Sequence, residues 1–363
     1  MTAPHLLNDL DTLLTEAAER HGLPKYRVKQ ARHWLLEKRA RDWDEMSELP
    51  KALRSKLAEE FKLWTATVAK HTQADDGTEK LLLSLEGGGR IECVLLRENV
   101  RGKVSTAEGR RRTMCISTQV GCGMGCVFCA SGLDGVDRNL TTGEIVEQVL
   151  RLQHLLAEDE RLSHLVVMGM GEPLANLDAL LDALHQVSRP DGLGVSPRRI
   201  TISTVGLPPA IRRLAEADSR YRLAISRHAP NDELRNQIVP VNQKIGVDAI
   251  MAAADDYYEV SGRRLTFEYV LLAELNDQPE HAHQLVRLLK DRHALLNVIP
   301  YNPVEGLPYQ TPSMERQQAF RAILERGGVE IRFRHRKGDK INAACGQLRR
   351  STPEGVTPLA TLG

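Results

Sequence analysis

The sequence predicts an α/β fold, in which a partial (β/α)6 barrel carries an N-terminal helical domain and a small β extension. From about residue 112 onward, short apolar segments alternate with amphipathic helical segments. Repeated strand–helix units imply parallel strands joined by right-handed crossovers. Six such units can be recognised, two fewer than the eight of a closed (β/α)8 barrel. Before this region the chain shows helical periodicity first and two strand-like segments next.

Residues 1–75 are predicted to form the N-terminal helical domain. A helix is predicted from Tyr26 because apolar side chains recur after it at helical spacing. This apolar stripe consists of Val28, Ala31, Leu35 and Leu36. A second helix is predicted to follow Ser47, a candidate cap, with Pro50 near its first turn.

Residues 76–105 are predicted to form the β extension, a hairpin followed by a linker. The segments Leu81–Leu85 and Ile91–Leu96 are rich in apolar residues, and the glycines at 87–89 between them indicate a turn. The barrel is predicted to begin after this linker and to span residues 106–330.

Six strands and the helices between them make up the predicted barrel. The strands are Met114–Thr118, His164–Met168, Arg199–Ser203, Arg222–Ser226, Leu265–Leu271 and Leu295–Ile299. The clearest helical segments are Thr142–Ala157, Leu177–Val187 and His281–Asp291. Val329–Arg334 is expected to add a seventh strand outside the barrel. Residues 331–350 are predicted to form a C-terminal strand and loop, and residues 351–363 a flexible tail.

The composition is that of a globular protein, with 42% hydrophobic and 27% charged residues. No apolar run approaches the ~18 residues that a membrane helix needs. The first residues carry acids and show no signal-peptide pattern. We therefore expect a cytoplasmic protein without a membrane partner, and we expect it to be a monomer.

Basic residues are concentrated in two segments, although the net charge is only +1. Residues 20–41 contain eight Lys or Arg against one acid, and residues 332–350 contain seven against one. Such clusters suggest an anionic ligand that is met on particular faces. Two solvated surfaces would explain the charge pattern equally well.

Four of the six cysteines lie within fifteen positions, which in a reducing compartment favours metal binding or catalysis over disulfides. Cys122, Cys126 and Cys129 form a Cys-x3-Cys-x2-Cys loop after the first predicted barrel strand. A [4Fe–4S] cluster normally takes four thiolates. Three would leave one iron open to the amino and carboxylate groups of S-adenosylmethionine (SAM). The alternative is a zinc site completed by a histidine such as His228.

The cysteine motif and its surroundings resemble one family. A Cys-x3-Cys-x2-Cys loop after the first strand is similar to the signature of the radical SAM superfamily. Nine segments resemble, in order, the branch of RNA adenosine methyltransferases that methylates carbon 2 of adenosine in 23S rRNA and tRNA. The segments are Leu49-Pro-Lys-Ala-Leu-Arg, Ile91-Glu92, Cys115-Ile-Ser-Thr-Gln-Val-Gly-Cys122, Asn139-Leu-Thr, Gly169-Met-Gly-Glu-Pro, Ile202-Ser-Thr, Ser226-Arg-His, Ile299-Pro-Tyr-Asn and Ala344-Cys-Gly-Gln-Leu. The resemblance implies a radical SAM barrel that holds a [4Fe–4S] cluster.

The resemblance also implies a mechanism that uses two SAM molecules per turnover. The first methylates Cys345, and the second yields a radical that removes a hydrogen from the S-methyl group. The resulting methylene radical joins the adenine carbon in a covalent protein–RNA adduct. Cys115 then attacks the Cys345 sulfur and leaves a disulfide, while Glu92 accepts the substrate proton. Thiols and carboxylates suit these roles as nucleophiles and base, although each residue alone could be merely structural.

The resemblance assigns the SAM contacts to the carboxyl ends of the strands, where barrel enzymes place their sites. Gly171 and Glu172 resemble the pair that holds the SAM amino group. The remaining contacts are Ser203, Ser226, Arg227, His228 and Asn302. Arg227 stands where the family usually has an apolar residue.

The implied partners are 23S rRNA, tRNA and an electron donor such as flavodoxin. Residues 1–75 and Arg332–Arg350 are the expected RNA-binding surfaces, acting largely through phosphates after the base has been exposed. A sister branch methylates carbon 8 and confers antibiotic resistance. Ser196-Pro-Arg-Arg resembles that branch, whereas Pro173 favours carbon 2. Two rival hypotheses are a radical SAM enzyme with a different substrate and a non-catalytic, metal-containing RNA-binding protein.

Overall fold

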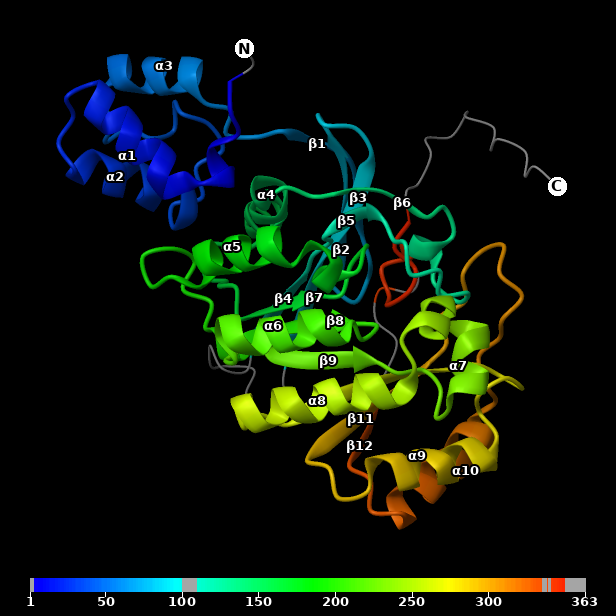
Figure 1. Cartoon of the computed structure of the whole chain (residues 1–363). Helices are drawn as coiled ribbons and strands as arrows, with labels where there is room; N and C mark the ends of the chain where they lie inside the picture. Colours follow the sequence, from blue (N-terminus) through cyan, green and yellow to red (C-terminus); the bar gives the residue numbers. More distant parts are fainter. Residues whose placement is uncertain (1–2, 100–109, 335–337, 339–340, 350–363) are drawn as a thin grey trace.

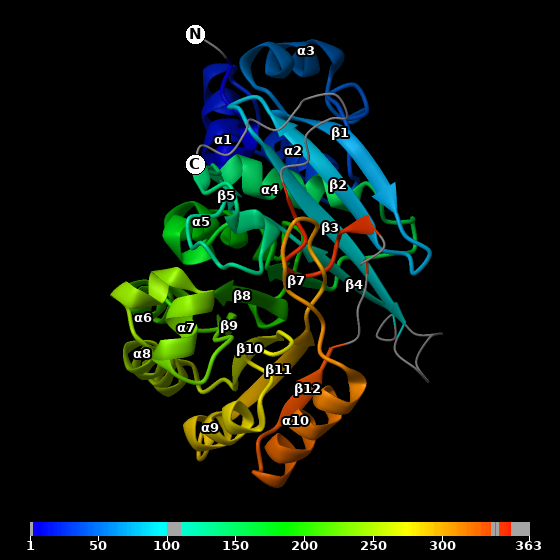
Figure 2. The same cartoon turned by 90° about the vertical axis from the view of Figure 1, so that its right-hand side faces the viewer.

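One curved sheet of ten strands runs through the molecule (Figures 1 and 2). The computed structural model describes residues 3–99, 110–334, 338 and 341–349, so the predicted tail at 351–363 lies outside the described residues. Within them the strand order is β1-β2-β3-β4-β7-β8-β9-β10-β11-β12. The bounds are β1 Ala66–Gln73, β2 Glu79–Leu85, β3 Arg90–Asn99, β4 Arg110–Cys115, β7 His164–Val167, β8 Ile200–Thr204, β9 Arg222–Ser226, β10 Leu265–Leu271, β11 Ala294–Pro300 and β12 Ile331–Phe333.

Neighbouring strands from β4 to β12 are parallel. Amphipathic helices return the chain between them and cover one face of the sheet (Figure 2). These helices are α4 Thr142–Gln153, α5 Leu177–Ser188, α6 Pro208–Asp218, α8 Val247–Ser261, α9 Pro279–Leu289 and α10 Met314–Arg326. A shorter helix, α7 (Asp232–Ile238), follows β9. The predicted partial (β/α)6 barrel is therefore confirmed, with β12 as the expected extra strand.

The first barrel strand ends sooner than predicted. β4 stops before the end of the predicted segment Met114–Thr118, because the Ser117 N–H donates to Gln148 Oε1 (2.8 Å) in place of a strand partner. The chain then forms β5 (Gln119–Gly121), which pairs with β6 (Val136–Asn139). This small hairpin was not predicted, and it carries the cysteine loop between its strands.

The N-terminal region is helical up to about residue 60, as its periodicity predicts. Its helices are α1 Leu10–Arg20, α2 Tyr26–Leu36 and α3 Lys51–Glu60. Three residues of the apolar stripe on α2 are buried and Val28 is partly buried. The expected cap at Ser47 is wrong, because Pro50 occupies the N-cap position of α3. The helical prediction also extended too far, since β1 begins at Ala66 and adds a third antiparallel strand to the predicted hairpin.

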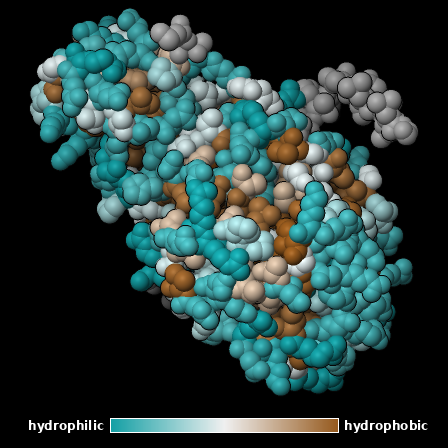
Figure 3. Space-filling view, in the orientation of Figure 1, coloured by the Kyte–Doolittle hydropathy of each residue, from teal (hydrophilic) through white to brown (hydrophobic). Residues whose placement is uncertain are grey.

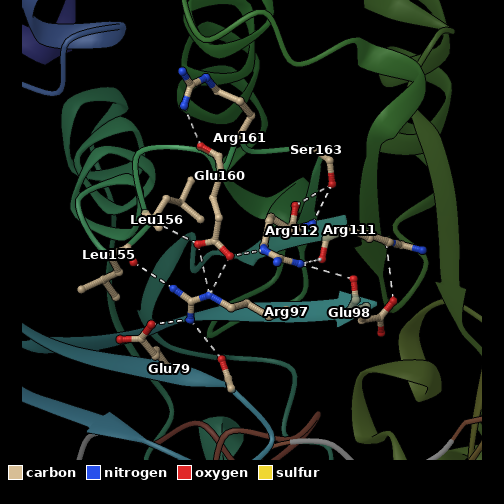
Figure 4. A network of polar contacts seen from close by, with 12 residues as sticks. Glu79, Arg97, Glu98, Arg111, Arg112, Leu155, Leu156, Glu160, Arg161 and Ser163 are labelled. Atoms are coloured by element: carbon tan, nitrogen blue, oxygen red, sulfur yellow. Dashed lines mark hydrogen bonds and ion pairs between the residues drawn. The ribbon is translucent and has the colours of Figure 1, made fainter. Parts of the chain in front are cut away.

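A polar network joins the β extension to the barrel (Figure 4), and one hydrogen bond connects it to the helical domain. Its centre is Glu160, in the loop after α4, whose carboxylate accepts hydrogen bonds from Arg97 (3.3 Å) and from Arg112. Arg97 also donates to the Leu155 carbonyl (2.8 Å). From the helical domain, Arg39 donates to the Glu160 carbonyl (2.7 Å). One loop thus holds charged side chains from all three parts of the chain.

The face of the molecule seen in Figure 3 is mainly hydrophilic, with apolar patches gathered toward its middle. None of the helices in the described ranges combines the length and hydropathy that crossing a bilayer requires. The apolar side chains are instead concentrated between the sheet and its helices.

Candidate active site

A cavity opens at the carboxyl ends of the parallel strands, and the cysteine loop forms one wall of it. Together with its open mouth it contains about 930 Å³ of space not filled by protein atoms. The other walls come from the residues after β7, from the ends of β8 to β11, and from Cys345 with Gly346. Parallel strands that end together explain why residues distant in sequence meet here.

Cys122, Cys126 and Cys129 all line this cavity. Backbone hydrogen bonds fix their loop, because the Cys122 N–H donates to the Gly135 carbonyl (2.8 Å) and the Cys129 N–H to that of Cys126 (3.1 Å). Burial raises the pKa of the Cys122 thiol to about 12, and it also raises the pKa of the other two. A cationic iron centre would compensate this cost by binding the thiolates. The donor set therefore fits an iron–sulfur cluster.

The histidine of the zinc alternative is already engaged. His228 Nδ1 accepts a hydrogen bond from the Val270 N–H (3.1 Å), and its ring packs edge-on against Phe128. In the part of the chain that the structure describes, no three His, Cys, Asp or Glu side chains are grouped closely enough to hold one metal ion. A structural zinc ion needs four such ligands, whereas in a cluster each cysteine binds a separate iron atom.

The turn after β7 presents Gly171 and Glu172 to the cavity. Gly171 has a φ of +101°, and a Cβ there would lie 2.7 Å from the Gln119 backbone nitrogen, so the position requires glycine. The Glu172 carboxylate accepts from the N–H groups of Leu174 (3.0 Å) and Val205 (2.9 Å). Burial raises the pKa of Glu172, and these N–H groups oppose that shift. The result is a fixed carboxylate, suited to an ammonium group of a ligand.

Most of the other predicted SAM contacts also line the cavity. Ser203 and Ser226 lie side by side on β8 and β9, with their hydroxyl oxygens 3.4 Å apart. Asn302 donates from Nδ2 to the Cys345 carbonyl (3.2 Å), while its buried Oδ1 has no hydrogen-bond partner within the described part of the chain. His228 completes the set and adopts a φ of 54°. An acceptor that is buried without a partner fits a ligand that brings a donor.

Arg227 differs from the other predicted contacts because its side chain does not line the cavity. It is fully buried, and none of its three side-chain nitrogens has a hydrogen-bond partner among the residues that the structure describes. Burial, reinforced by the neighbouring charge of Arg235, lowers the pKa of Arg227 to about 9. Arg235 was not predicted as a site residue, yet it is equally buried and donates to the carbonyls of Arg227 (3.1 Å) and Ser226 (3.1 Å). It therefore fixes the end of β9 below the cavity.

The segment that carries Cys345 is hydrogen-bonded to the cysteine loop. The Ala130 N–H donates to the Gly346 carbonyl (2.8 Å), and the Ser131 hydroxyl donates to the Leu348 carbonyl (2.7 Å). Cys345 itself is exposed at the cavity wall. The protein around its thiol raises its pKa by desolvation, and the positive charge of Arg334 opposes the shift.

Cys115 and Glu92 lie behind the cavity lining. Burial raises the pKa of Cys115 to about 12, and the neighbouring Cys345 adds to the shift, so the two thiols are electrostatically coupled. All six cysteines are free, however, so the disulfide expected between this pair is not present. The Glu92 carboxylate pairs with Lys80 (2.8 Å) and accepts from the Arg349 N–H (2.8 Å).

The fold and the cavity together define a radical SAM enzyme. The family model described as Radical SAM superfamily matches residues 116–286, and that described as Ribosomal RNA large subunit methyltransferase N-terminal domain matches residues 6–63. A crystal structure of a radical SAM methyltransferase from Sphaerobacter thermophilus is 40% identical, with a TM-score of 0.88 over 96% of this chain and 100% of that one.

Curated relatives carry the comparison further. A protein of Rhodopirellula baltica, named "probable dual-specificity RNA methyltransferase RlmN", is 59% identical over 96% of this chain and 92% of its own length. A similarly named protein of Opitutus terrae is 44% identical over 98% and 97%. The chain belongs to the RlmN family of dual-specificity RNA methyltransferases. It is a SAM-dependent RNA methyltransferase, and its cofactors are a [4Fe–4S] cluster and SAM.

Proposed function

We propose that the enzyme methylates carbon 2 of adenosine in 23S rRNA and tRNA through S-methylated Cys345 and a covalent protein–RNA adduct. The observation that carries this proposal is the position of Cys345, which lines the same cavity as the three loop cysteines. Carbon 2 of adenine lies between two electronegative nitrogens and is not nucleophilic. Its methylation therefore needs radical chemistry rather than direct attack on the SAM methyl group.

The lining residues have separate binding roles in this proposal. Cys122, Cys126 and Cys129 hold the cluster. The backbone at Gly171 and the Glu172 carboxylate hold the ammonium group of SAM. The hydroxyl and amide contacts come from Ser203, Ser226, His228 and Asn302, with the backbone of Arg227 next to them. When bound, the cluster and SAM supply the methyl group and the carbon radical.

The protein's own thiols carry the methyl group to RNA and release the product. Cys345 takes up the methyl group. Its S-methyl carbon would give one hydrogen atom to the carbon radical that bound SAM supplies, and it then bonds to carbon 2 of adenine, with one electron passing from the adduct to the cluster. Glu92 takes the proton from carbon 2. Cys115 next loses its proton and attacks the Cys345 sulfur, so that the bond from sulfur to the transferred carbon breaks, that carbon gains a proton to become the methyl group, and a disulfide forms. Two electrons from a donor such as flavodoxin restore the thiols. Glu92 accepts from Arg349, four residues after Cys345, which links the base to the methyl carrier.

The basic residues of the helical domain fall into two groups. Arg32 is buried and pairs with Asp11 (3.1 Å), and Arg39 donates to the loop after α4, so both are structural. Exposed basic side chains remain for phosphate contacts: Lys25, Lys29, Lys38 and Arg41. In the C-terminal segment Arg332 and Arg349 are exposed, while Arg336, Lys337, Lys340 and Arg350 lie outside the described residues. We propose that these faces bind RNA and that the enzyme acts as a cytoplasmic monomer.

The choice of carbon atom can be tested directly. Anaerobically reconstituted enzyme is incubated with 23S rRNA fragments or tRNA, SAM and a reductant, and the RNA is digested to nucleosides. Mass spectrometry with authentic standards should detect 2-methyladenosine from both RNAs. Detection of 8-methyladenosine in its place would assign the enzyme to the sister activity.

A further inference from the structure

Glu268, on β10, is a carboxylate that the mechanism above does not use. It is 5% exposed and lines the cavity together with Cys345. Its Oε1 accepts a hydrogen bond from Asn297 Nδ2 (2.9 Å), which fixes the side chain from β11. Its buried Oε2 has no hydrogen-bond partner in the parts of the chain that the structure describes. A buried carboxylate oxygen is costly unless something donates to it, so this oxygen is available to a proton or a donor.

Glu268 and Arg334 are the two charged side chains that shift the pKa of Cys345. Arg334, just after β12, lies 3.9 Å from Glu268 Oε1 through its NH2 nitrogen. The same guanidinium lowers the pKa of Cys345, and the Glu268 carboxylate raises it. The other groups that face Cys345 are Cys129 from the cysteine loop and Cys115 from β4. Among the charged groups of the described residues, Glu268 therefore raises the pKa of this thiol most, and the positive charge of Arg334 opposes that shift.

The two other carboxylates of the site are already engaged. Both oxygens of Glu172 accept from backbone N–H groups. Both oxygens of Glu92 are held, by Lys80 and by Arg349, and this side chain is not part of the lining. A thiol must lose its proton before it can act as a nucleophile. Cys345 needs a base for this, because desolvation raises its pKa above the ordinary value.

We propose that Glu268 accepts the Cys345 proton when Cys345 is methylated, while Arg334 stabilises the thiolate. The S–H bond of Cys345 breaks and its proton passes to Glu268 Oε2. The sulfur electron pair then bonds to the methyl group of SAM, and the bond from that methyl to the sulfonium breaks, leaving S-adenosylhomocysteine. No electron donor takes part in this step. The inference rests on the proposed function, since it concerns the methylation of Cys345.

The test measures the reactions of the Cys345 thiol without RNA. It uses the cluster-loaded enzyme under anaerobic conditions and without reductant. After addition of SAM, peptide mass spectrometry records the rate at which Cys345 gains a methyl group. A parallel sample is treated with iodoacetamide, which reports the reactivity of the same thiol without SAM. The variants are Glu268→Gln and Glu268→Asp, and the control is Glu280→Gln, an exposed carboxylate on α9. Equilibrium binding of SAM and iron content are measured for each.

For Glu268→Gln we expect both methylation and alkylation of Cys345 to slow by about 100-fold near pH 7, the low end for loss of a general base. SAM affinity and iron content should be unchanged. Glu268→Asp should recover part of the rate, and Glu280→Gln should match the wild type. Burial raises the pKa of Glu268 above 4.5, so the wild-type rate should fall as the pH drops through that raised value. In Glu268→Gln the rate should instead rise by about tenfold per pH unit as the thiol itself ionises.

Wild-type methylation and alkylation rates in Glu268→Gln would overturn the inference. So would weaker SAM binding with normal alkylation, because Glu268 would then be a SAM ligand. If Glu268→Gln loses its cluster, the decision rests on Glu268→Asp. The alkylation rate of Cys345 in Glu268→Asp must then lie between the rates of wild type and Glu268→Gln. If wild-type Cys345 never gains a methyl group, the proposed function fails, and alkylation still decides whether Glu268 is the base.

Discussion

The wall proposed to hold the cofactors and the residues proposed to act on RNA are constructed differently. Along the wall, Gly171, Ser203 and Ser226 each lie at or just beyond the end of a parallel strand, and the register of the sheet brings them together. The reactive residues come from unrelated places: Glu92 from the antiparallel extension, Cys115 from β4 and Cys345 from the C-terminal segment. The comparison teaches that the cofactor wall depends on local sequence and strand order, whereas the reactive set depends on a few long-range hydrogen bonds.

The largest loss of activity is expected from a substitution in the wall proposed to hold the cofactors. Cys126→Ala removes one of three thiolates from the loop, and a cluster with too few ligands is not retained. Anaerobically purified wild-type protein should contain about four irons per chain, with sulfide. The variant should lose both, and with them all RNA methylation. Stoichiometric zinc without sulfide in the wild type would contradict the assignment of this wall to a cluster.

Substitutions of the two reactive cysteines, Cys115 and Cys345, should block the reaction at two distinguishable steps. Cys115→Ala keeps the methyl carrier, so it should still attack RNA and then accumulate a covalent protein–RNA adduct, seen as a shifted band on a denaturing gel. Cys345→Ala should give neither adduct nor product, although it still cleaves SAM slowly. Product formation should fall by at least about 100-fold in both. The buried, non-lining Cys93→Ala is the matched control and should turn over normally. Normal turnover of Cys115→Ala would refute the adduct mechanism.

A smaller effect is expected on stability. Substitutions of the two buried arginines beneath the wall, Arg227 and Arg235, should change the free energy of unfolding differently. Arg235→Met leaves the buried carbonyls of Arg227 and Ser226 without their donor and should destabilise the fold by about 1–3 kcal/mol for each. Arg227→Met removes a buried charge that has no hydrogen-bond partner in the described ranges, so it should be neutral or stabilising by about 1 kcal/mol. Chemical denaturation of the cluster-free forms measures both changes.

The same arginines give a pH dependence with a definite sign. The pKa of Arg227 is lowered to about 9 from an ordinary 12.5, so above pH 9 the unfolded chain binds more protons than the folded one. The contribution of Arg227 to the free energy of unfolding should therefore rise with pH above 9, so the gain of Arg227→Met over wild type should shrink there. An Arg227→Met variant as unstable as Arg235→Met would show that Arg227 has a partner after all.

The amino-acid sequence by itself determined the order of strands and helices, the cysteine loop and the glycine at 171. Alternating apolar strands and amphipathic helices leave few arrangements other than a parallel sheet with right-handed crossovers. A motif within one short loop is also readable without the fold, as Cys122, Cys126 and Cys129 illustrate. By contrast, β1 and the β5–β6 hairpin were missed, because short strands are defined by their pairing partners rather than by their own composition.

Only the tertiary structure decided which polar groups are free and which are engaged. Sequence cannot reveal that both oxygens of Glu92 are held. Nor can it reveal that, among the described residues, Arg227 has no hydrogen-bond partner and one oxygen of the cavity-lining Glu268 has none. Hydrogen-bond satisfaction and burial depend on neighbours far along the chain, so the same carboxylate is a surface charge in one fold and a base in another. For this protein, spacing predicts the loop proposed to bind the cluster, whereas long-range packing determines which carboxylate keeps an oxygen available for a proton beside it.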